Sequence, residues 1–238
     1  MTAIKTAVVV FPGSNCDRDC ARSWEAITGQ KAEFVWHKES AVPNYDFVIV
    51  PGGFAFGDYL RCGAIARYSP VMAEIKRLAE RGSRILGICN GFQILTEAHL
   101  LPGALLRNRG LAYICKDIYL KIENNRTDFT AGYQSGEIIR LPIGHGEGSF
   151  TINPAGLKKL QDENRIVARY CEPDGAVKQD SAPNGSLDNI AGVISERGNV
   201  MGLMPHPERL GETILGGDDG RRMFESVLKA VIAEGGLK

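Results

Sequence analysis

Short, almost wholly apolar runs alternate with helical patterns through the first hundred residues, and this alternation limits the possible folds more than any other feature of the sequence. Strands that lack polar alternation are typical of a sheet buried on both faces. Repeated strand–helix–strand units place helices over both faces of an open, mostly parallel sheet. The sequence therefore predicts an α/β fold, with strands at residues 6–11, 32–36, 45–50 and 84–88 and helices at 71–81 and 90–98.

The turn after the first predicted strand leads into a further helix. Ser14 or Asn15 is expected to cap its N-terminus, because the side-chain oxygen of either residue can accept a hydrogen bond from the first N–H groups. Apolar side chains then recur at helical spacing as far as Gly29, a residue suited to end a helix. This helix completes the first strand–helix–strand unit.

The second half of the chain has a different pattern. Residues 118–122 and 137–143 alternate apolar and polar side chains, as expected of strands with one face in water. We expect them to form a small antiparallel or mixed sheet at the edge of the parallel core. No linker or internal repeat divides residues 1–238, which are expected to form one domain. The other predicted elements are helices at 153–162 and 218–233 and strands at 165–171, 190–195 and 200–204.

The balance of charge argues against several classes of protein. The 28 Lys and Arg residues equal the 28 Asp and Glu residues, so the chain lacks the basic surplus of a protein that grips nucleic acid or an anionic membrane. No apolar run approaches the roughly 18 residues of a membrane span. Six cysteines without a paired C-x-x-C pattern are typical of reduced thiols. We therefore expect a cytoplasmic protein with neither nucleic acid nor a membrane as partner.

A candidate nucleophile stands where the predicted strand 84–88 meets the next helix. Cys89 lies between Gly87 and Gly91, and this spacing in this context is typical of a strained nucleophile elbow. The helix N-terminus would favour the thiolate, and the backbone N–H of Asn90 could stabilise an oxyanion. The alternative is a buried structural cysteine beside tight-turn glycines.

His206 and His145 are the two candidate bases for Cys89, since each begins a His-x-Glu triplet. In extended backbone the side chains of residues i and i+2 point the same way, so Glu208 or Glu147 could orient its histidine. His206 is favoured because it follows a predicted strand and stands between two prolines that restrict the backbone. The spacing does not exclude His145.

A glycine-rich loop that begins at Gly52 and Gly53 follows the predicted strand 45–50. It matches neither common phosphate-binding pattern. We expect it to present backbone N–H groups beside the elbow, and a plain turn is the alternative. Cys16 and Cys20 lack further metal ligands at suitable spacing, so they are interpreted as core residues and no metal site is predicted.

The elbow, the glycine-rich loop and the order of Cys before His-x-Glu resemble the class I glutamine amidotransferases. Four longer segments are similar to the glutaminase subunits of phosphoribosylformylglycinamidine synthase, and the resemblance runs nearly end to end. These segments are 11–17, 52–66, 145–148 and 205–209.

The resemblance implies a flavodoxin-like core and a triad of Cys89, His206 and Glu208, with Gly53 and Asn90 as the oxyanion hole. It implies hydrolysis of L-glutamine to glutamate through a Cys89 thioester, with ammonia passed on for de novo purine biosynthesis. His145 would lie near the glutamine site or the partner face without being the base. Contacts to the substrate are expected from Gly52, Gln93, Gly146, Glu147 and Gly148.

The same resemblance implies two partner chains. A large synthetase subunit would hold ATP and Mg²⁺, and a small subunit would bridge the two, so no cofactor is expected on this chain. The alternatives are a glutaminase partner of another synthase and a stand-alone α/β cysteine hydrolase.

Overall fold

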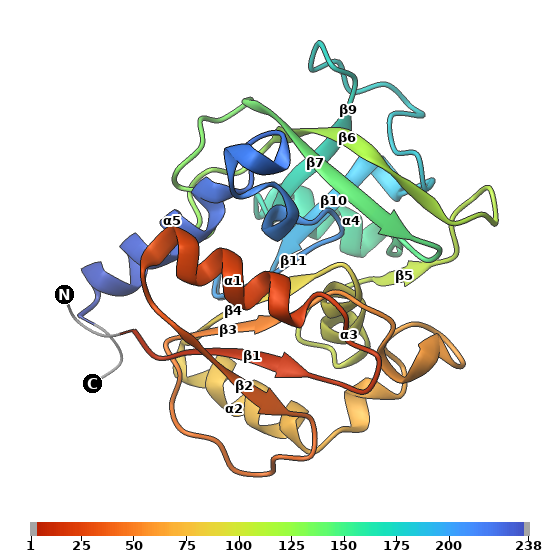
Figure 1. The fold of residues 1–238 in the computed structure, drawn as a ribbon. Helices are drawn as coiled ribbons and strands as arrows, with labels where there is room; N and C mark the ends of the chain where they lie inside the picture. The colour runs from red at the N-terminus through yellow and green to blue at the C-terminus, as the bar shows by residue number, and fades with distance from the viewer. Residues whose placement is uncertain (1–3, 236–238) are drawn as a thin grey trace.

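One sheet of nine strands forms the centre of the computed structural model, which describes residues 4–235 (Figure 1). Its strand order is β2-β1-β3-β4-β11-β10-β9-β6-β7. The strands from β2 to β11 in this order run parallel, as the unbroken apolar pattern predicts. They are β1 (Thr6–Val10), β2 (Ala32–Trp36), β3 (Phe47–Val50), β4 (Arg84–Ile88) and β11 (Val200–Leu203).

The remaining strands of this sheet pair antiparallel. Side chains along β6 and β7 alternate between buried and more exposed, as expected of strands with one wet face. Both strands run further than the sequence predicts, and β7 reaches His145. The strands are β6 (Ile114–Ile122), β7 (Ile138–His145), β9 (Ile166–Cys171) and β10 (Ile190–Ile194).

A second, two-stranded antiparallel sheet lies outside the sequence prediction. It pairs β5 (Ala104–Leu106) with β8 (Ser149–Thr151), runs of only three residues that carry little periodic signal. β8 begins directly after Gly148, so this small sheet helps to hold the 146–148 loop next to the end of β7.

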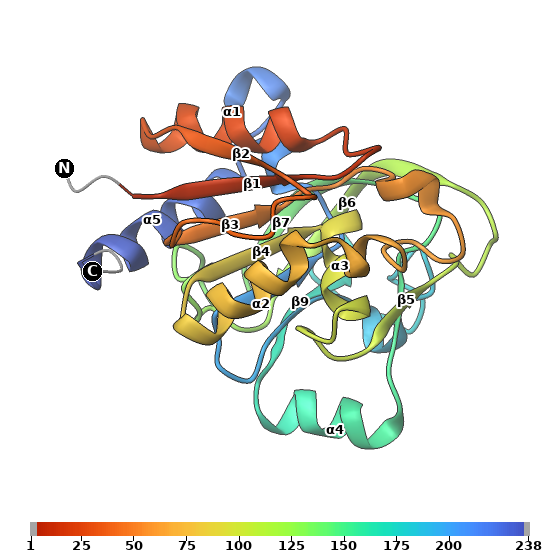
Figure 2. The same ribbon diagram turned by 90° about the horizontal axis from the view of Figure 1, so that it is seen from below.

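Helices cover both faces of the parallel strands, which confirms the predicted layers. Figure 2 shows α1 (Asp17–Thr28) on one side of these strands, with α2 (Val71–Arg81) and α3 (Asn90–Glu97) on the other. α5 (Arg221–Ala233) packs against α1, while α4 (Pro154–Asp162) connects β8 to β9. The helices therefore bury the sheet from both sides.

Trp24 ties three of these elements together. Its side chain is fully buried, and its ring centroid lies 5.1 Å from that of Phe47 in β3 and 6.5 Å from that of Phe224 in α5. Aromatic pairs at such distances add to the free energy gained by burying their apolar area. None of the helices within residues 4–235 is long and apolar enough to cross a membrane.

The start of α1 differs from the sequence prediction. Its N-cap is Cys16, and no side chain caps it, so the expectation of Ser14 or Asn15 is wrong. The Ser14 hydroxyl instead accepts a hydrogen bond from the Phe11 N–H at 3.1 Å, which closes the turn after β1. The predicted end of the helix is confirmed, because Gly29 has a left-handed φ of 70°.

Candidate active site

The carboxyl ends of four neighbouring strands gather the segments that the sequence singles out. β1, β3, β4 and β11 are adjacent and parallel, and they lead into the 11–16 turn, the Gly52 loop, Cys89 and the His206 segment. Parallel strands end at the same edge of a sheet, and open α/β sheets place their sites there. The fold therefore brings segments far apart in the sequence to one place.

Cys89 occupies a strained elbow between β4 and α3, as the sequence predicts. Its φ of 51° and ψ of −108° are unfavourable for a residue with a side chain. A Cβ on Gly87 would lie 2.8 Å from the Gly91 carbonyl group, and one on Gly91 would overlap the Val50 carbonyl oxygen. Both flanking positions therefore require glycine for space.

His206 and Glu208 form a buried pair beside the elbow. The Nδ1 of His206 lies 2.6 Å from Oε1 of Glu208, and the two residues are 1% and 2% exposed. The His206 N–H also donates to the Pro142 carbonyl of β7 at 2.9 Å, which fixes the backbone. Because Nδ1 is engaged by the carboxylate, Nε2 is the nitrogen left for proton transfer.

The electrostatics of the site favour a thiolate and imidazolium pair. Burial raises the pKa of the Cys89 thiol, but the charge of His206 and the nearby His145 imidazole outweigh it and lower the pKa to about 6. Burial acts to lower the pKa of His206, yet the Glu208 carboxylate and the Cys89 thiolate raise it well above its usual value. Each charge of the pair therefore stabilises the other.

The two candidate oxyanion groups are linked by the side chain of Asn90. Its Oδ1 accepts a hydrogen bond from the Ala55 N–H in the glycine-rich loop at 3.1 Å, and its Nδ2 donates to Gln93 Oε1 at 2.9 Å. The backbone N–H of Asn90 is the first of α3 and has no intrahelical partner. No described hydrogen bond uses the N–H of Gly53. Both N–H groups are therefore available to a ligand.

Gly53 is fixed by close packing against the 11–16 turn. Its φ is 144°, and a Cβ there would lie 2.8 Å from the Asn15 nitrogen. The Phe54 N–H donates to Gly13 O at 3.0 Å, and the Cys16 N–H donates to Gly52 O at 3.3 Å. The loop therefore packs on its own chain, unlike an open phosphate cradle.

Four of the five expected substrate-contact residues form one connected group, and the fifth lies apart from it. Gln93 is buried, and its Nε2 donates to the backbone carbonyl of Glu147. The Glu147 side chain accepts from the Cys62 N–H at 3.1 Å, and the Gly148 N–H donates to Asn108 Oδ1 at 3.0 Å. Gly146 O accepts from the Asn108 N–H at 2.9 Å, so Asn108 holds both glycines of this loop. Gly52 lies apart from this group, between the reactive side chains: a Cβ there would meet His206 at 2.8 Å and Cys89 at 3.5 Å.

Cys16 is buried, as the sequence interpretation expects, and it also borders the site. Its Sγ accepts a hydrogen bond from Arg209 Nη2 at 3.0 Å, and possible ligand atoms of Cys16, His206 and Glu208 lie within 4.8 Å of one another. The guanidinium beside Cys16 makes a second cation there unfavourable. The only available signal was that Cys16 and Arg209 lie within two segments of the family resemblance.

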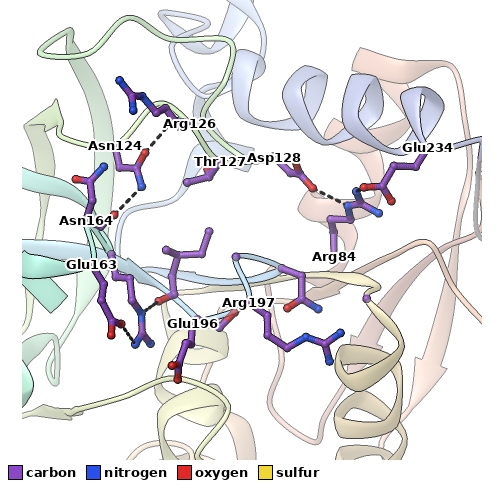
Figure 3. A pocket seen from close by; sticks show the side chains of 16 residues that line it. Arg84, Asn124, Arg126, Thr127, Asp128, Glu163, Asn164, Glu196, Arg197 and Glu234 are labelled. Carbon is purple, nitrogen blue, oxygen red and sulfur yellow. Dashed lines mark hydrogen bonds and ion pairs between the residues drawn. The ribbon is translucent and has the colours of Figure 1, made fainter. Parts of the chain in front are cut away.

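A separate polar pocket lies at the other end of β4, where Arg84 begins the strand (Figure 3). Its cavity volume is about 460 Å³. Arg84 lies 2.8 Å from Asp128 and 2.5 Å from Glu234, and Arg165 lies 3.1 Å from Glu163. These cations are paired, and none of the described residues that line the pocket is Cys or His. The chemistry therefore belongs to the Cys89 end of the sheet.

Known proteins share this sequence and this fold. Residues 3–217 match the family of CobB/CobQ-like glutamine amidotransferase domains. The chain is 52% identical over 230 residues to the phosphoribosylformylglycinamidine synthase subunit PurQ of Gloeobacter violaceus, covering 97% of this chain and 99% of that protein. It is also 52% identical to the same-named subunit of Pseudothermotoga lettingae, with 94% of each chain covered.

A solved structure extends this similarity to three dimensions. A chain of PurLQS from Thermotoga maritima superposes with a TM-score of 0.85 at 44% identity, covering 97% of this chain and all of that chain. A glutamine amidotransferase from the same organism, 16% identical with a TM-score of 0.55, shares the fold alone. The elbow, the buried His206–Glu208 pair and these matches agree: the chain belongs to the glutamine amidotransferase family of phosphoribosylformylglycinamidine synthase PurQ subunits.

Proposed function

We propose that this chain is the glutaminase subunit of phosphoribosylformylglycinamidine synthase, with Cys89 as nucleophile and His206 and Glu208 completing a catalytic triad. The observation that carries the proposal is the strained elbow, which sets a thiol with a pKa of about 6 beside the buried His206–Glu208 pair. A thiolate at neutral pH is the reactive form of cysteine.

In the first half of the reaction, the Cys89 thiolate attacks the side-chain carboxamide carbon of L-glutamine. A C–S bond forms, and the carbonyl oxygen becomes an oxyanion that the N–H groups of Gly53 and Asn90 stabilise. The His206 imidazolium then gives its Nε2 proton to the amide nitrogen. The C–N bond breaks, ammonia leaves, and a glutamyl thioester remains on Cys89.

In the second half, neutral His206 accepts a proton from water as the water oxygen attacks the thioester carbon. The C–S bond breaks, glutamic acid leaves, and the thiolate and imidazolium pair is restored. Glu208 holds His206 Nδ1 through both halves and stabilises the positive charge each time it forms. The triad thus returns to its starting protonation.

The amino-acid end of glutamine is proposed to bind along Gln93 and the 146–148 loop, next to Gly52. The contact between Gln93 and the Glu147 carbonyl places these two segments side by side, which supports a shared role.

The ammonia is proposed to pass to a large synthetase subunit that binds ATP and Mg²⁺, with a small third subunit as bridge. There it converts formylglycinamide ribonucleotide to formylglycinamidine ribonucleotide in purine biosynthesis. The similarity to a chain of PurLQS supports these partners. The close packing of the Gly52–Gly53 loop on the 11–16 turn supports the proposal that this chain holds no nucleotide or metal itself.

The proposed location is the cytoplasm, and the lack of disulfide pairing among the described cysteines supports it. All six cysteines lie in the described residues, and each is free. Reduced thiols persist in a reducing compartment, and the proposed mechanism needs Cys89 as a thiolate.

The test is a glutamine turnover assay on the chain with and without the ATP-dependent synthetase partner. We expect ammonia release from glutamine that depends on Cys89 and is abolished in Cys89→Ser. The exposed Cys115 supplies the matched control, because Cys115→Ser should keep the wild-type rate. Rapid cleavage of peptides or esters without any turnover of glutamine would overturn the proposal in favour of a stand-alone hydrolase.

A further inference from the structure

A second buried histidine lies against the nucleophile. His145, at the end of β7, is 3% exposed and directly follows Gly144, whose carbonyl accepts a hydrogen bond from the Cys89 thiol at 3.8 Å. A Cβ on Gly148 would overlap the His145 ring, so glycine at 148 makes room for the imidazole. The triad proposed above does not use this histidine.

The side chain of Asn184 fixes the chemical role of one ring nitrogen. Its Oδ1 accepts a hydrogen bond from the Ser186 N–H at 3.1 Å, so the other end of the amide must be the NH₂ group. That Nδ2 lies 2.9 Å from Gly148 O, 3.1 Å from the Tyr170 hydroxyl oxygen and 3.1 Å from His145 Nε2. Asn184 is fully buried, so water does not compete for these contacts.

An amide NH₂ group can only donate, so His145 Nε2 must face it with a lone pair. The ring proton of the neutral imidazole is then on Nδ1. Nδ1 is buried and has no hydrogen-bond partner among the described residues, and the Cys89 thiol contacts the carbonyl of the preceding residue, Gly144, at 3.8 Å. Nδ1 is therefore the ring nitrogen left for the Cys89 sulfur. An N–H at this position is a donor and cannot accept the thiol proton.

We propose that His145 acts directly on the nucleophile: held by Asn184 as the Nδ1–H tautomer, it donates a hydrogen bond to the Cys89 sulfur and stabilises the thiolate. This inference rests on the proposed function, in which Cys89 is the nucleophile. The two histidines then have different roles. His206 moves protons, whereas His145 keeps its proton and supports the negative charge.

Other groups also interact electrostatically with the Cys89 thiol, and a test of His145 must leave them unchanged. His206, on the segment after β11, supplies positive charge that favours the thiolate. Tyr113 and Tyr170 interact electrostatically with Cys89 from the β6 side and from β9, and Arg209 does so from beside His206. Glu208 and Cys16 act on His206. The variants below leave all of these side chains in place.

The test follows alkylation of Cys89 by iodoacetamide against pH in the full chain, with the Cys89 peptide quantified by mass spectrometry. The wild type should show a midpoint near pH 6. His145→Leu should raise this midpoint by about one pH unit or more, which slows alkylation about tenfold at pH 5. His145→Asn places an amide donor near the position of Nδ1 and should restore a midpoint close to that of the wild type.

A control variant, His99→Asn, changes an exposed histidine beyond α3 and should leave the midpoint unchanged. A folded His145→Leu variant with the wild-type midpoint would overturn the inference, as would equal shifts in the Leu and Asn variants. A wild-type midpoint near that of an ordinary thiol would instead overturn the proposed function. The two failures are therefore distinguishable.

A second measurement does not require His145→Leu to fold. In the ¹⁵N-histidine-labelled wild type, the four side chains give separate nitrogen correlations, and His145→Asn identifies the signal of His145 by its loss. We expect the chemical shifts of a neutral ring protonated on Nδ1. A ring protonated on Nε2 alone would contradict the proposal.

Discussion

His206 Nδ1 lies 2.6 Å from Glu208 Oε1, with both side chains almost fully removed from solvent. A buried imidazole and carboxylate this close favour the imidazolium, because an uncompensated buried charge on either side would be costly. The adjacent Cys89 thiolate carries the balancing negative charge. In the proposed mechanism, this pair holds the proton that the leaving group takes up.

The different roles assigned to His206 and His145 can be tested by comparing the asparagine variant of each. His206→Asn should lower ammonia release by about 10²–10⁴-fold, because the variant lacks the group that protonates the leaving nitrogen. His145→Asn should keep most of the activity, since the amide retains a donor toward Cys89. Steady-state assays on the two purified variants give the answer. The opposite ranking would show that His145 is the base and that the triad proposed above is incorrect.

The charge of Glu208 should set the pH range of activity. In the wild type, kcat/KM should fall below pH of about 6, as the Cys89 thiolate takes up a proton. Glu208→Gln removes the charge that raises the pKa of His206, so the imidazolium is less favoured and the pKa of Cys89 rises. The acid limb should therefore move to higher pH, with a lower maximum rate.

The pH–rate profile of glutamine turnover measures both effects of Glu208→Gln. Glu196→Gln is a suitable control, because Glu196 is exposed and lines the separate pocket at the other end of β4. An unchanged acid limb in Glu208→Gln would contradict the assigned role of the carboxylate.

The role of a residue could be predicted from the sequence where that role depends on its near neighbours in the chain. Cys89 could be predicted because glycines two residues away on each side report the backbone strain. The i, i+2 spacing predicts the pairing of His206 with Glu208, but the backbone there is the 3₁₀ helix Pro207–Leu210 and not the expected extended chain. The roles of Cys16 and Asn184 could not be predicted from the sequence. Cys16 meets Arg209 across 193 residues, and Asn184 meets His145 across 39, so neither contact leaves a periodic or local pattern.

Short elements were missed for a related reason. β5 and β8 have three residues each, too few to show a period, and their pairing depends on tertiary position. The Ser14 cap failed because its hydroxyl has a competing partner one turn earlier, the Phe11 N–H. Local propensity favours Ser14 and Asn15 as caps but cannot show which partner each side chain takes in the folded chain.

The requirement for glycine at position 91 can be tested by measuring the thermal stability of Gly91→Ala. A methyl group on Gly91 would overlap the Val50 carbonyl oxygen, so Gly91→Ala must displace β3 or α3. Such overpacking typically costs about 1–3 kcal/mol. Gly110→Ala is the matched control, because a Cβ there meets nothing within 4 Å. Thermal melting should show a lower Tm for Gly91→Ala alone, and equal melting of the two variants would contradict the packing argument.

The side chain of Asn90 should affect kcat, because it links the Gly53 loop to the elbow. Asn90→Ala removes the hydrogen bonds to the Ala55 N–H and to Gln93, so the Gly53 loop loses its tether to the elbow. A misplaced oxyanion donor typically costs about 10²–10³-fold in kcat. We expect a loss approaching that range, with alkylation of Cys89 retained because the thiol itself is untouched. Equal losses of turnover and of alkylation would indicate a general collapse of the site.

The loop after Gly53 combines strained backbone with an exposed apolar side chain, so we expect it to respond to a docked partner. Phe56, Asp58 and Leu60 all have positive φ, between 55° and 70°, and the Leu60 side chain is 89% exposed. Strained backbone beside an exposed apolar side chain can rearrange when a partner covers it. We therefore expect glutamine turnover to rise when the synthetase and bridging subunits bind. Leu60→Asp should weaken this rise without changing the basal rate, as kcat titrated against partner concentration would show. An isolated chain that already turned glutamine over at the full rate of the complex would exclude such gating.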